Sequence, residues 1–262
     1  MAEDPNEGLA PLLALAIDWL ALSERSNIPL ELTAHSLRER GDWRLSIYRT
    51  GSEIEGVSIV MPRGDWFLEA RGPSAAIYLA NAAAIRGRRP ATLTTTERVR
   101  ALIAPILSEK GAVRAEYELR TLMCTKAPSI KEGRWAVSAD LPALKEYELL
   151  IDRDQRELID TSWERLIARK ELAVLTRNDA VLASIRRYGP APSFAGIADL
   201  FVVPQARRGR IGTGLAGFVL GEILAQRQAV YVLVDGSDAV TLTFYDSLGF
   251  EDLGTCYKAD LK

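Results

Sequence analysis

Apolar and polar positions along the chain follow two periods, and the changes of period predict a mixture of helices and strands. A helix that buries one face repeats apolar residues about every three or four positions, whereas a short run of β-branched and apolar residues predicts a strand. In the first half the pattern predicts helices over 9–22, 74–86 and from Thr94 onward, and strands over 43–48, 56–61 and 116–124. The polar turn 49–52 is expected to join the first two strands into a hairpin.

The second half of the chain has the same mixture. The pattern predicts strands over 134–137, 171–176, 181–187, 197–203 and 229–235, a helix start at 138–142, and helices over 211–226 and 238–248. Gly249 follows the last of these helices, where a glycine often ends a helix because it adopts the left-handed conformation without strain. Both halves are therefore predicted to be α/β.

One helix of the first half carries two local signals. Thr94 and Glu97 have the spacing of a capping box, so Thr94 is expected to begin that helix. Pro105 lies within the same apolar repeat and is expected to kink or shorten the helix, because proline lacks a backbone donor.

A polar segment without periodicity, 125–133, separates the two halves and contains one proline. The chain has 262 residues, enough for two modest domains at roughly 150 residues each. We therefore predict an N-terminal domain over 1–128 and a second domain over 129–262.

The composition excludes several classes of site. The chain holds one histidine, His35, so it cannot supply a zinc site of several histidines, and a nucleophile–His–acid triad would have to use this residue. His35 stands in a polar stretch without a motif, and we expect a surface or capping histidine. No metal site is expected.

Charge and cysteine content indicate the compartment. Lys and Arg number 33 against 35 Asp and Glu, a balance that gives no reason to expect nucleic acid as a partner. Cys124 and Cys256 have no partner motif, so we expect core packing and a reducing, cytoplasmic location. The apolar run 9–22 contains Asp18 and is shorter than the roughly 20 residues that a bilayer requires, so no membrane association is expected.

The segment 202–215 is the most informative one for chemistry. It comprises the end of a predicted buried strand, a loop with Arg207, Arg208 and Arg210, and the start of a predicted helix. Free N–H groups at a helix start bind anions, glycines admit a close approach, and arginines add charge-assisted hydrogen bonds. This segment predicts a phosphate site.

A second interpretation of the same glycines is dinucleotide binding. Gly212, Gly214 and Gly217 match the G-x-G-x-x-G fingerprint, and Asp235 ends the next predicted strand. However, the residues 205–211 separate the strand from the first glycine, and only 27 residues follow Asp235, too few to complete such a fold. An NAD-binding protein is therefore the lesser alternative.

The same segment resembles the acetyl-CoA pyrophosphate loop of the GCN5-related N-acetyltransferase (GNAT) superfamily. The family pattern V-x-P-x-x-R-x-x-G-I-G-x-x-L appears as Val202, Pro204, Arg207, Ile211, Gly212 and Leu215, while Arg210 replaces the first loop glycine and Gly209 stands one residue early.

A second motif follows downstream in the family's order. The pattern N-x-x-A-x-x-x-Y-x-x-x-G-F resembles 238–250, with Tyr245, Gly249 and Phe250 conforming and with Asp238 and Thr241 departing. The resemblance covers about 130–262. The first half resembles the degenerate N-terminal domain of tandem members.

The resemblance implies transfer of an acetyl group from acetyl-CoA to a small-molecule or peptide amine. It implies a mixed, mostly antiparallel sheet flanked by helices, which splays at the strand before the loop, where the backbone of 200–203 pairs with the pantetheine arm. Tyr245 would supply a proton or hydrogen bond to the departing thiolate. The cofactor-binding residues carried over are Phe201, Val202, Val203, Arg207, Arg208, Gly209, Arg210, Ile211, Gly212, Thr213 and Asp238.

The sequence does not decide which group acts as the general base. Positions where family members often carry a glutamate are Gly196 and Leu233 here, so Asp199 and Asp235 remain as candidates, with Asp199 preferred. A base acting through water and an amine that arrives neutral are equally open. The alternative of another class is a regulatory protein that binds acetyl-CoA without catalysis.

Two arginine groups lie outside these motifs. Arg186 and Arg187 frame the acceptor or end an exposed strand, and the cluster 86–89 is expected to be a solvated helix end. A homodimer is an open alternative for the assembly.

Overall fold

The computed structural model describes residues 9–22, 27–37, 43–85, 90–109, 112–151, 159, 161–189 and 191–262. The chain forms two compact units. The first comprises Met1–Thr121, Leu233–Ala239 and Asp252–Lys262, and the second comprises Leu122–Val232 and Val240–Glu251. The chain passes into the second unit near residue 122 and returns twice to the first. The division at residue 128 stays a prediction about domains.

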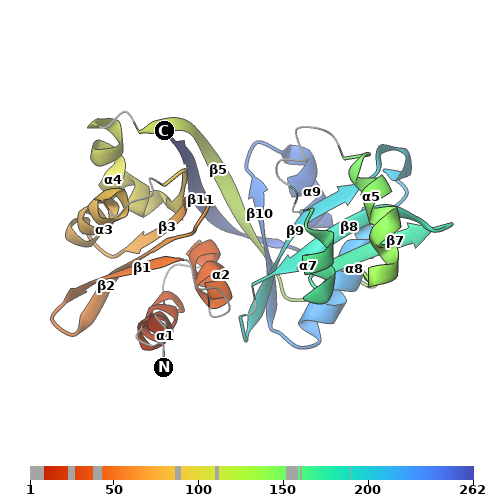
Figure 1. Cartoon of the computed structure of the whole chain (residues 1–262), viewed down its shortest axis with the longest axis horizontal. Helices are drawn as coiled ribbons and strands as arrows, with labels where there is room; N and C mark the ends of the chain where they lie inside the picture. Colours follow the sequence, from red (N-terminus) through yellow and green to blue (C-terminus); the bar gives the residue numbers. More distant parts are fainter. Residues whose placement is uncertain are drawn as a thin grey trace, which may run out of the picture. The chain divides into compact units, whose positions relative to one another are not determined.

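The first unit is a sheet with helices packed against it (Figure 1). Its elements are α1 (Leu9–Leu20), α2 (Ile28–Ser36), β1 (Arg44–Thr50), β2 (Glu53–Val60), β3 (Asp65–Ala70), α3 (Pro73–Ile85), β4 (Thr92–Thr96), α4 (Glu97–Glu109), and most of β5 (Val113–Cys124) and β11 (Glu251–Leu261). The strand order is β1-β2-β3-β4-β11-β5. The predicted hairpin of the first two strands is confirmed, and β3 with β4 is a parallel pair.

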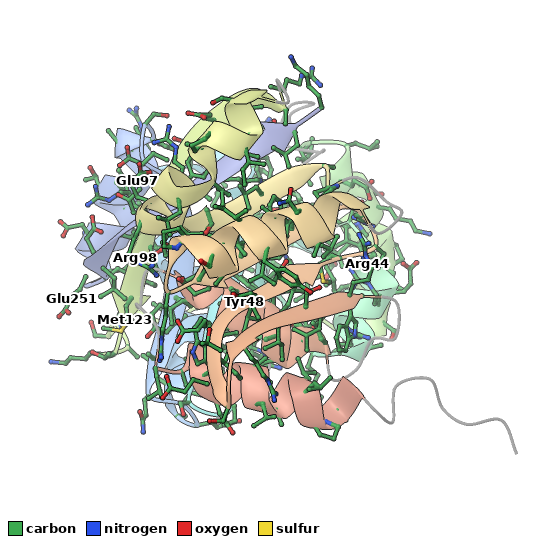
Figure 2. All side chains as sticks on the ribbon, turned by 90° about the vertical axis from the view of Figure 1, so that its left-hand side faces the viewer. Arg44, Tyr48, Glu97, Arg98, Met123 and Glu251 are labelled. Atoms are coloured by element: carbon green, nitrogen blue, oxygen red, sulfur yellow. The ribbon has the colours of Figure 1, made fainter. Side chains whose placement is uncertain are left out.

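The core of the first unit lies between α3, α4 and the strands. Trp66, Leu79 and Ile103 are buried there. One charge is buried beside this core: the Glu69 carboxylate accepts hydrogen bonds from the Arg98 guanidinium at 2.5 Å and from the Ala70 N–H at 3.0 Å. Figure 2 labels Arg98 at the start of α4. The pairing is needed because a buried charge without a partner would be strongly destabilising.

The last strand of the chain belongs to the first unit, where it pairs antiparallel with β4. Polar side chains also connect it to β5: the Tyr117 hydroxyl donates to Asp260 at 2.9 Å, and Thr255 donates to Glu118 at 3.2 Å. The C-terminal residues are therefore a structural part of the first unit.

The second unit carries the segments with the GNAT-like motifs. Its elements are β6 (Arg134–Trp135), α5 (Leu141–Glu148), α7 (Trp163–Ala168), β7 (Leu172–Arg177), β8 (Ala180–Tyr188), β9 (Phe194–Val202), α8 (Ile211–Leu224), and most of β10 (Ala229–Asp235) and α9 (Ala239–Ser247). The strand order is β10-β9-β8-β7-β6. The pair β9–β10 is parallel and the pairs β6–β7, β7–β8 and β8–β9 are antiparallel. The predicted mixed, mostly antiparallel sheet is confirmed.

Helices fix the strands of the second unit. α5 packs on β8, α7 packs on β7, and α8 packs on β7, β8 and β9 (Figure 1). Asp140 fixes the start of α5, since its carboxylate accepts two hydrogen bonds of 2.7 Å from Arg134 and one of 2.8 Å from the Val137 N–H. The hydrogen bond from Arg134 lowers the pKa of Asp140.

One prediction about local structure is wrong, and a second is narrowed. Thr94 lies in β4 rather than at a helix start, because the threonine-rich run 92–96 has the β-branched composition of a strand and pairs with β3 and β11. The helix begins at Glu97, and the hydroxyl of Thr96 accepts from the N–H of Val99 at 3.3 Å. Pro105 lies inside α4, which continues to Glu109, so the proline does not shorten the helix at this position, and the kink stays a prediction.

Other elements carried no clear signal in the sequence. These are α2, β3, α7 and β11. His35 lies in the last turn of α2 and is buried, so it is not a surface histidine, and the alternative of a capping histidine stays a prediction; its Nε2 is 3.9 Å from a carboxylate oxygen of Glu31. Among the described helices, none combines the length and the apolar character needed to cross a bilayer.

Candidate functional site

The two parallel strands of the second unit, β9 and β10, separate after the first three residues of β9. Backbone pairs join Ala229 to Phe194, Val230 to Ala195 and Tyr231 to Gly196, and no pair follows although β9 continues to Val202. Beyond Gly196 this edge of β9 is therefore not paired with β10, and the edge of a strand can pair with an extended ligand. The predicted splay before the loop is present.

A β-bulge lies in β9 just beyond the point of divergence. Ala198 pairs with Arg186 and Phe201 pairs with Ser184, so Asp199 and Leu200 together oppose a single residue of β8. Asp199 has φ +57°, the left-handed conformation that an extra strand residue often takes. The bulge turns the Asp199 side chain toward β8, where Oδ2 accepts from Nε of Arg186 at 2.6 Å.

Tyr147 of α5 holds the C-terminal end of β9. Its hydroxyl donates to the carbonyl oxygen of Phe201 at 2.8 Å and is 3.0 Å from the hydroxyl of Ser184. The ring also contacts Phe201 edge-on, with 5.7 Å between the centroids. Burial raises the pKa of Tyr147, so it stays a neutral hydrogen-bond donor. Both strands that form the bulge are thus fixed to α5.

The side chain of Arg207 stabilises the loop that follows β9. The Arg207 Nε donates to the carbonyl oxygen of Val202 at 3.0 Å, and its guanidinium lies 5.5 Å from the ring centroid of Phe201. Arg207 therefore supports the loop in addition to contributing charge. Phe201 and Val203 are buried beneath the loop, so their side chains belong to the core and only their backbones can serve a ligand.

The start of α8 offers a group of N–H donors. Arg210 precedes the helix and provides no side-chain cap, and the first helical hydrogen bond to it comes from the Gly214 N–H at 2.9 Å. The N–H groups of 211–213 therefore lack partners within the helix, as at any helix start. With the dipole of a 14-residue helix behind them and arginines at 208 and 210 beside them, they suit a phosphate or diphosphate.

Two loop arginines take a strained backbone conformation. Arg208 has φ +63° and Arg210 has φ +60°, in the left-handed region that glycine adopts freely. Arg210 occupies the position of the family's glycine, so the loop keeps the glycine conformation although a side chain is present. Strain at a loop with anion donors is typical of a binding site.

Replacing Arg210 with glycine tests this strain. A side chain in the left-handed region costs about 1–2 kcal/mol, part of which the more flexible unfolded glycine chain offsets, so Arg210→Gly should raise Tm by about 1–3 °C. The control is Arg169→Gly, which removes an exposed arginine at φ −91° and should leave Tm equal or lower. Thermal unfolding followed by circular dichroism compares them; equal shifts in both variants contradict the strain.

The remaining glycines of α8 face protein rather than ligand. A methyl group at Gly214 would lie 2.9 Å from Cβ of Glu132, and one at Gly217 would overlap the carbonyl oxygen of Ile130. The Glu132 N–H also donates to the carbonyl oxygen of Gly214 at 2.9 Å. The segment 128–132 thus lies directly on α8, and this contact explains Gly214 and Gly217 of the G-x-G-x-x-G match, while Gly212 faces Val202 and Phe244. They give no support to a dinucleotide site.

Tyr245 lies on α9 in an aromatic cluster. Its ring contacts Phe244 and Phe250, with centroid distances of 5.1 and 5.0 Å, and the residue is 4% exposed. Among the described residues, none hydrogen-bonds its hydroxyl. Burial raises the pKa of Tyr245, and the charges of Tyr188 and Asp199 raise it further. The phenol therefore stays protonated near neutral pH and remains able to donate.

The candidate bases are engaged with neighbouring groups. The Asp199 carboxylate is ion-paired with Arg186, and both side chains are largely buried. Asp235 closes a local turn, accepting from the N–H and hydroxyl of Ser237 at 2.8 and 2.6 Å, and these hydrogen bonds lower its pKa. Neither arrangement marks a base, so the assignment of Asp199 stays a prediction.

Some predicted residues lie elsewhere. Asp238 is exposed and belongs to the first unit, so its role toward the loop stays a prediction. The cluster 86–89 lies outside the described residues. Arg187 packs over the ring of Trp135 at 5.1 Å and donates to the Lys170 carbonyl oxygen at 3.2 Å. Within the described part of the chain, no three His, Cys, Asp or Glu residues gather into a metal site.

Two residues of this region were not predicted from the sequence: Tyr147, which anchors β9, and Tyr188, whose ring covers Gly196. Arg186 was expected to frame the acceptor or to end an exposed strand, but its ion pair with Asp199 was not expected. Gly196 precedes the predicted strand 197–203, and the structure places it inside β9, where a glycine allows a close approach.

The fold was compared with proteins of known structure. No protein-family model matches the chain. No curated protein matches it either. A Drosophila protein superposes with a TM-score of 0.70 at 12% identity, over 98% of this chain and 97% of its own. A GCN5-related N-acetyltransferase from Sphaerobacter thermophilus gives 0.60 at 16%, over 88% and 84%.

A third structure bears on the domain arrangement. A tandem GNAT protein from the clavulanic acid biosynthesis pathway superposes with a TM-score of 0.57 at 16% identity, over 99% of this chain and 97% of its own. At such identities the likeness shows the fold alone. The chain has the fold of the GNAT acetyltransferases, and the tandem structure supports a two-domain arrangement.

Proposed function

We propose that this chain, which has the fold of the GNAT acetyltransferases, transfers an acetyl group from acetyl-CoA to a primary amine. One observation carries the proposal: the divergence of β9 from β10 leads directly into a loop with arginines and the uncapped start of α8. The edge of β9 that is not paired with β10 suits the amide-bearing pantetheine arm, and a helix start suits a diphosphate. The low identity of the structural neighbours leaves acetyl-CoA use to be tested.

The residues of this region fit acetyl-CoA, which supplies an activated acetyl thioester when bound. The N–H groups of 211–213 and the side chains of Arg208 and Arg210 would hold the diphosphate. The edge of β9 over 200–203 would bind the pantetheine amides. A backbone N–H at the bulge, near Asp199 and Leu200, would donate to the oxygen that gains negative charge in the transition state, where fixed donors stabilise most effectively.

Tyr245 would donate a hydrogen bond or proton to the leaving thiolate. Its raised pKa means that the proton is present across the neutral range. The attacking amine must be neutral, and the free α-amino group has a pKa of about 8. Loss of the amine proton to solvent satisfies this requirement without a side-chain base.

The pH dependence follows from these two groups. With an α-amine as acceptor, kcat/KM should rise about tenfold per pH unit up to about pH 8, as the amine loses its proton, and then stay level to about pH 9.5. The level portion is expected because burial raises the pKa of Tyr245 above its ordinary value. Initial rates between pH 6 and 9.5 measure the profile; a decline that begins below pH 9 contradicts the role of Tyr245.

A catalytically inactive regulatory protein that binds acetyl-CoA is the second candidate. The observation that favours it is the ion pair between Asp199 and Arg186, because this pair engages the carboxylate that was expected to act as the base. The transferase and the regulatory protein would both bind acetyl-CoA, but only the transferase would release thiol in the presence of an amine.

The experiment that tests the proposal is release of free thiol. The protein is incubated with acetyl-CoA and a panel of amines (alanine amide, tyramine and cadaverine), and thiol is measured against a control without amine. Amine-dependent thiol release supports the transferase. Binding of acetyl-CoA without release supports the regulatory protein, and the absence of both overturns the proposal.

A further inference from the structure

A tyrosine ring occupies the place of a side chain at Gly196. Tyr188 of β8 and Gly196 of β9 are direct partners in the antiparallel pair. A methyl group at Gly196 would lie 2.5 Å from Cε1 and 2.8 Å from Cε2 of Tyr188, and closer still to Cζ, the carbon that bears the hydroxyl. Such separations are impossible for real atoms, so only glycine admits the ring in this position.

Gly196 lies at the point where β9 and β10 separate, so the ring of Tyr188 lies there as well. Gly196 is the last residue of β9 that pairs with β10, since its partner Tyr231 ends the parallel register. Because Cζ is the ring atom nearest to Gly196, the hydroxyl of Tyr188 lies beside the point where the two strands separate. This is the end of the strand opening that the proposed function assigns to the acyl donor.

Arg186 and Asp199 fix the ring from the side. Arg186 and Tyr188 are two residues apart in β8 and therefore share one face of the sheet. The Arg186 guanidinium lies 5.3 Å from the centroid of the Tyr188 ring, and its Nε donates to Asp199 at 2.6 Å. The β-bulge thus has a consequence beyond β9 itself, because it brings Asp199 to the arginine that packs on Tyr188.

A second phenol lies in the same neighbourhood. After burial, the negative charge that an ionised Tyr188 would carry is a further cause of the raised pKa of Tyr245, so the two phenols lie within electrostatic range of each other. An acyl transfer is assisted by positioned polar groups, one toward the leaving sulfur and one toward the attacking nitrogen. Tyr245 is assigned to the sulfur, which leaves Tyr188 for the nitrogen.

We propose that Tyr188 positions the acceptor amine: its hydroxyl oxygen accepts a hydrogen bond from the amine N–H at the point where β9 and β10 separate. Gly196 provides the space for its ring, and the Arg186–Asp199 ion pair fixes the ring's orientation. The inference rests on the proposed transferase function and adds the residue that selects and orients the acceptor. An acceptor without an N–H is not held at this position.

The test is Tyr188→Phe, which removes the hydroxyl and keeps the ring over Gly196. With the most active amine of the panel, KM for the amine should rise about tenfold, the fold-change of one lost hydrogen bond, while kcat changes less. The dissociation constant of that amine for the protein saturated with CoA should rise equally, and acetyl-CoA affinity should stay within twofold. An unchanged amine KM and dissociation constant overturn the role of Tyr188.

Gly196→Ala provides an independent variant, because it displaces the ring without removing the hydroxyl. It should raise the amine KM as Tyr188→Phe does, and an unchanged KM contradicts the importance of the ring position. Tyr78→Phe, on an exposed tyrosine of the first unit, is the control and should change neither constant.

The pH profile separates positioning from proton transfer. Tyr188→Phe should keep the wild-type profile, and a shifted profile overturns the positioning role. Failure of the proposed function looks different, since the wild-type protein itself would then release no thiol with any amine, and the role of Tyr188 would fall with it.

Discussion

Tyr245→Phe should lower kcat by about 10²–10³-fold, the range expected on loss of a positioned proton donor. The ring contacts with Phe244 and Phe250 remain in the variant, so its affinity for acetyl-CoA should stay within twofold. Stability should stay equal or rise slightly, because no described residue hydrogen-bonds the hydroxyl and its removal leaves no partner unsatisfied. Steady-state thiol release, acetyl-CoA titration and thermal unfolding measure the three quantities.

The control for this variant is Tyr257→Phe in the first unit. Tyr257 is also buried, but its hydroxyl donates to Glu116 at 2.8 Å, so its loss should cost about 1 kcal/mol of stability without an effect on kcat. A reversed pattern, with activity kept in Tyr245→Phe and lost in Tyr257→Phe, would remove Tyr245 from the mechanism.

Gly217→Ala should destabilise the protein by about 3 kcal/mol and lower Tm by about 6–12 °C. Helix propensity alone predicts the opposite sign, since alanine is favoured over glycine in a helix by about 1 kcal/mol. The reason is the segment 128–132: the added methyl would overlap the carbonyl oxygen of Ile130. A backbone atom cannot move aside as a flexible side chain does, so the segment must leave α8.

The matched control is Gly72→Ala, where a methyl group meets no atom within 4 Å. This variant should leave Tm within about 2 °C of the wild-type value, the scale of an ordinary surface substitution. An equal or higher Tm for Gly217→Ala would show that the segment 128–132 does not pack on α8.

The elements that the sequence predicted share strong local signals. The strands 171–176 and 181–187 around a polar turn, the strand 229–235 and the helix before Gly249 all appear close to the predicted bounds. Asn178, Asp179 and Gly249 have positive φ in the structure, as the turn and helix-end signals require. Periodicity and turn chemistry decide these elements locally.

The elements that were missed depend on tertiary contacts. The spacing of Thr94 and Glu97 predicts a helix start, but pairing with β3 and β11 makes the segment 92–96 a strand. β11 is the chain's last strand, and its place in the first unit depends on partners more than 130 residues away, such as Glu118 and Tyr117. No local pattern contains that information.

For the candidate site, the motifs located the loop and α8 but not the groups around them. The left-handed conformation of Arg210 was not predicted, because the sequence shows only that an arginine stands where the family pattern has a glycine. The β-bulge at Asp199 comes from the pairing of β9 with β8. Asp199 was preferred as a base from its position alone, and its ion pair with Arg186 could not be read from the sequence. Gly196 stands where family members often carry a glutamate, and only the structure shows that the ring of Tyr188 occupies the space of a side chain at this position.

The most direct test of the central claim is thermal unfolding of the protein with acetyl-CoA and, separately, with NADH. If β9 and the start of α8 bind acetyl-CoA, that ligand at 100 times its dissociation constant should add about 2.7 kcal/mol and raise Tm by about 5–10 °C, while NADH should leave Tm unchanged. A shift with NADH alone, or no shift with acetyl-CoA at millimolar concentration, would contradict the account.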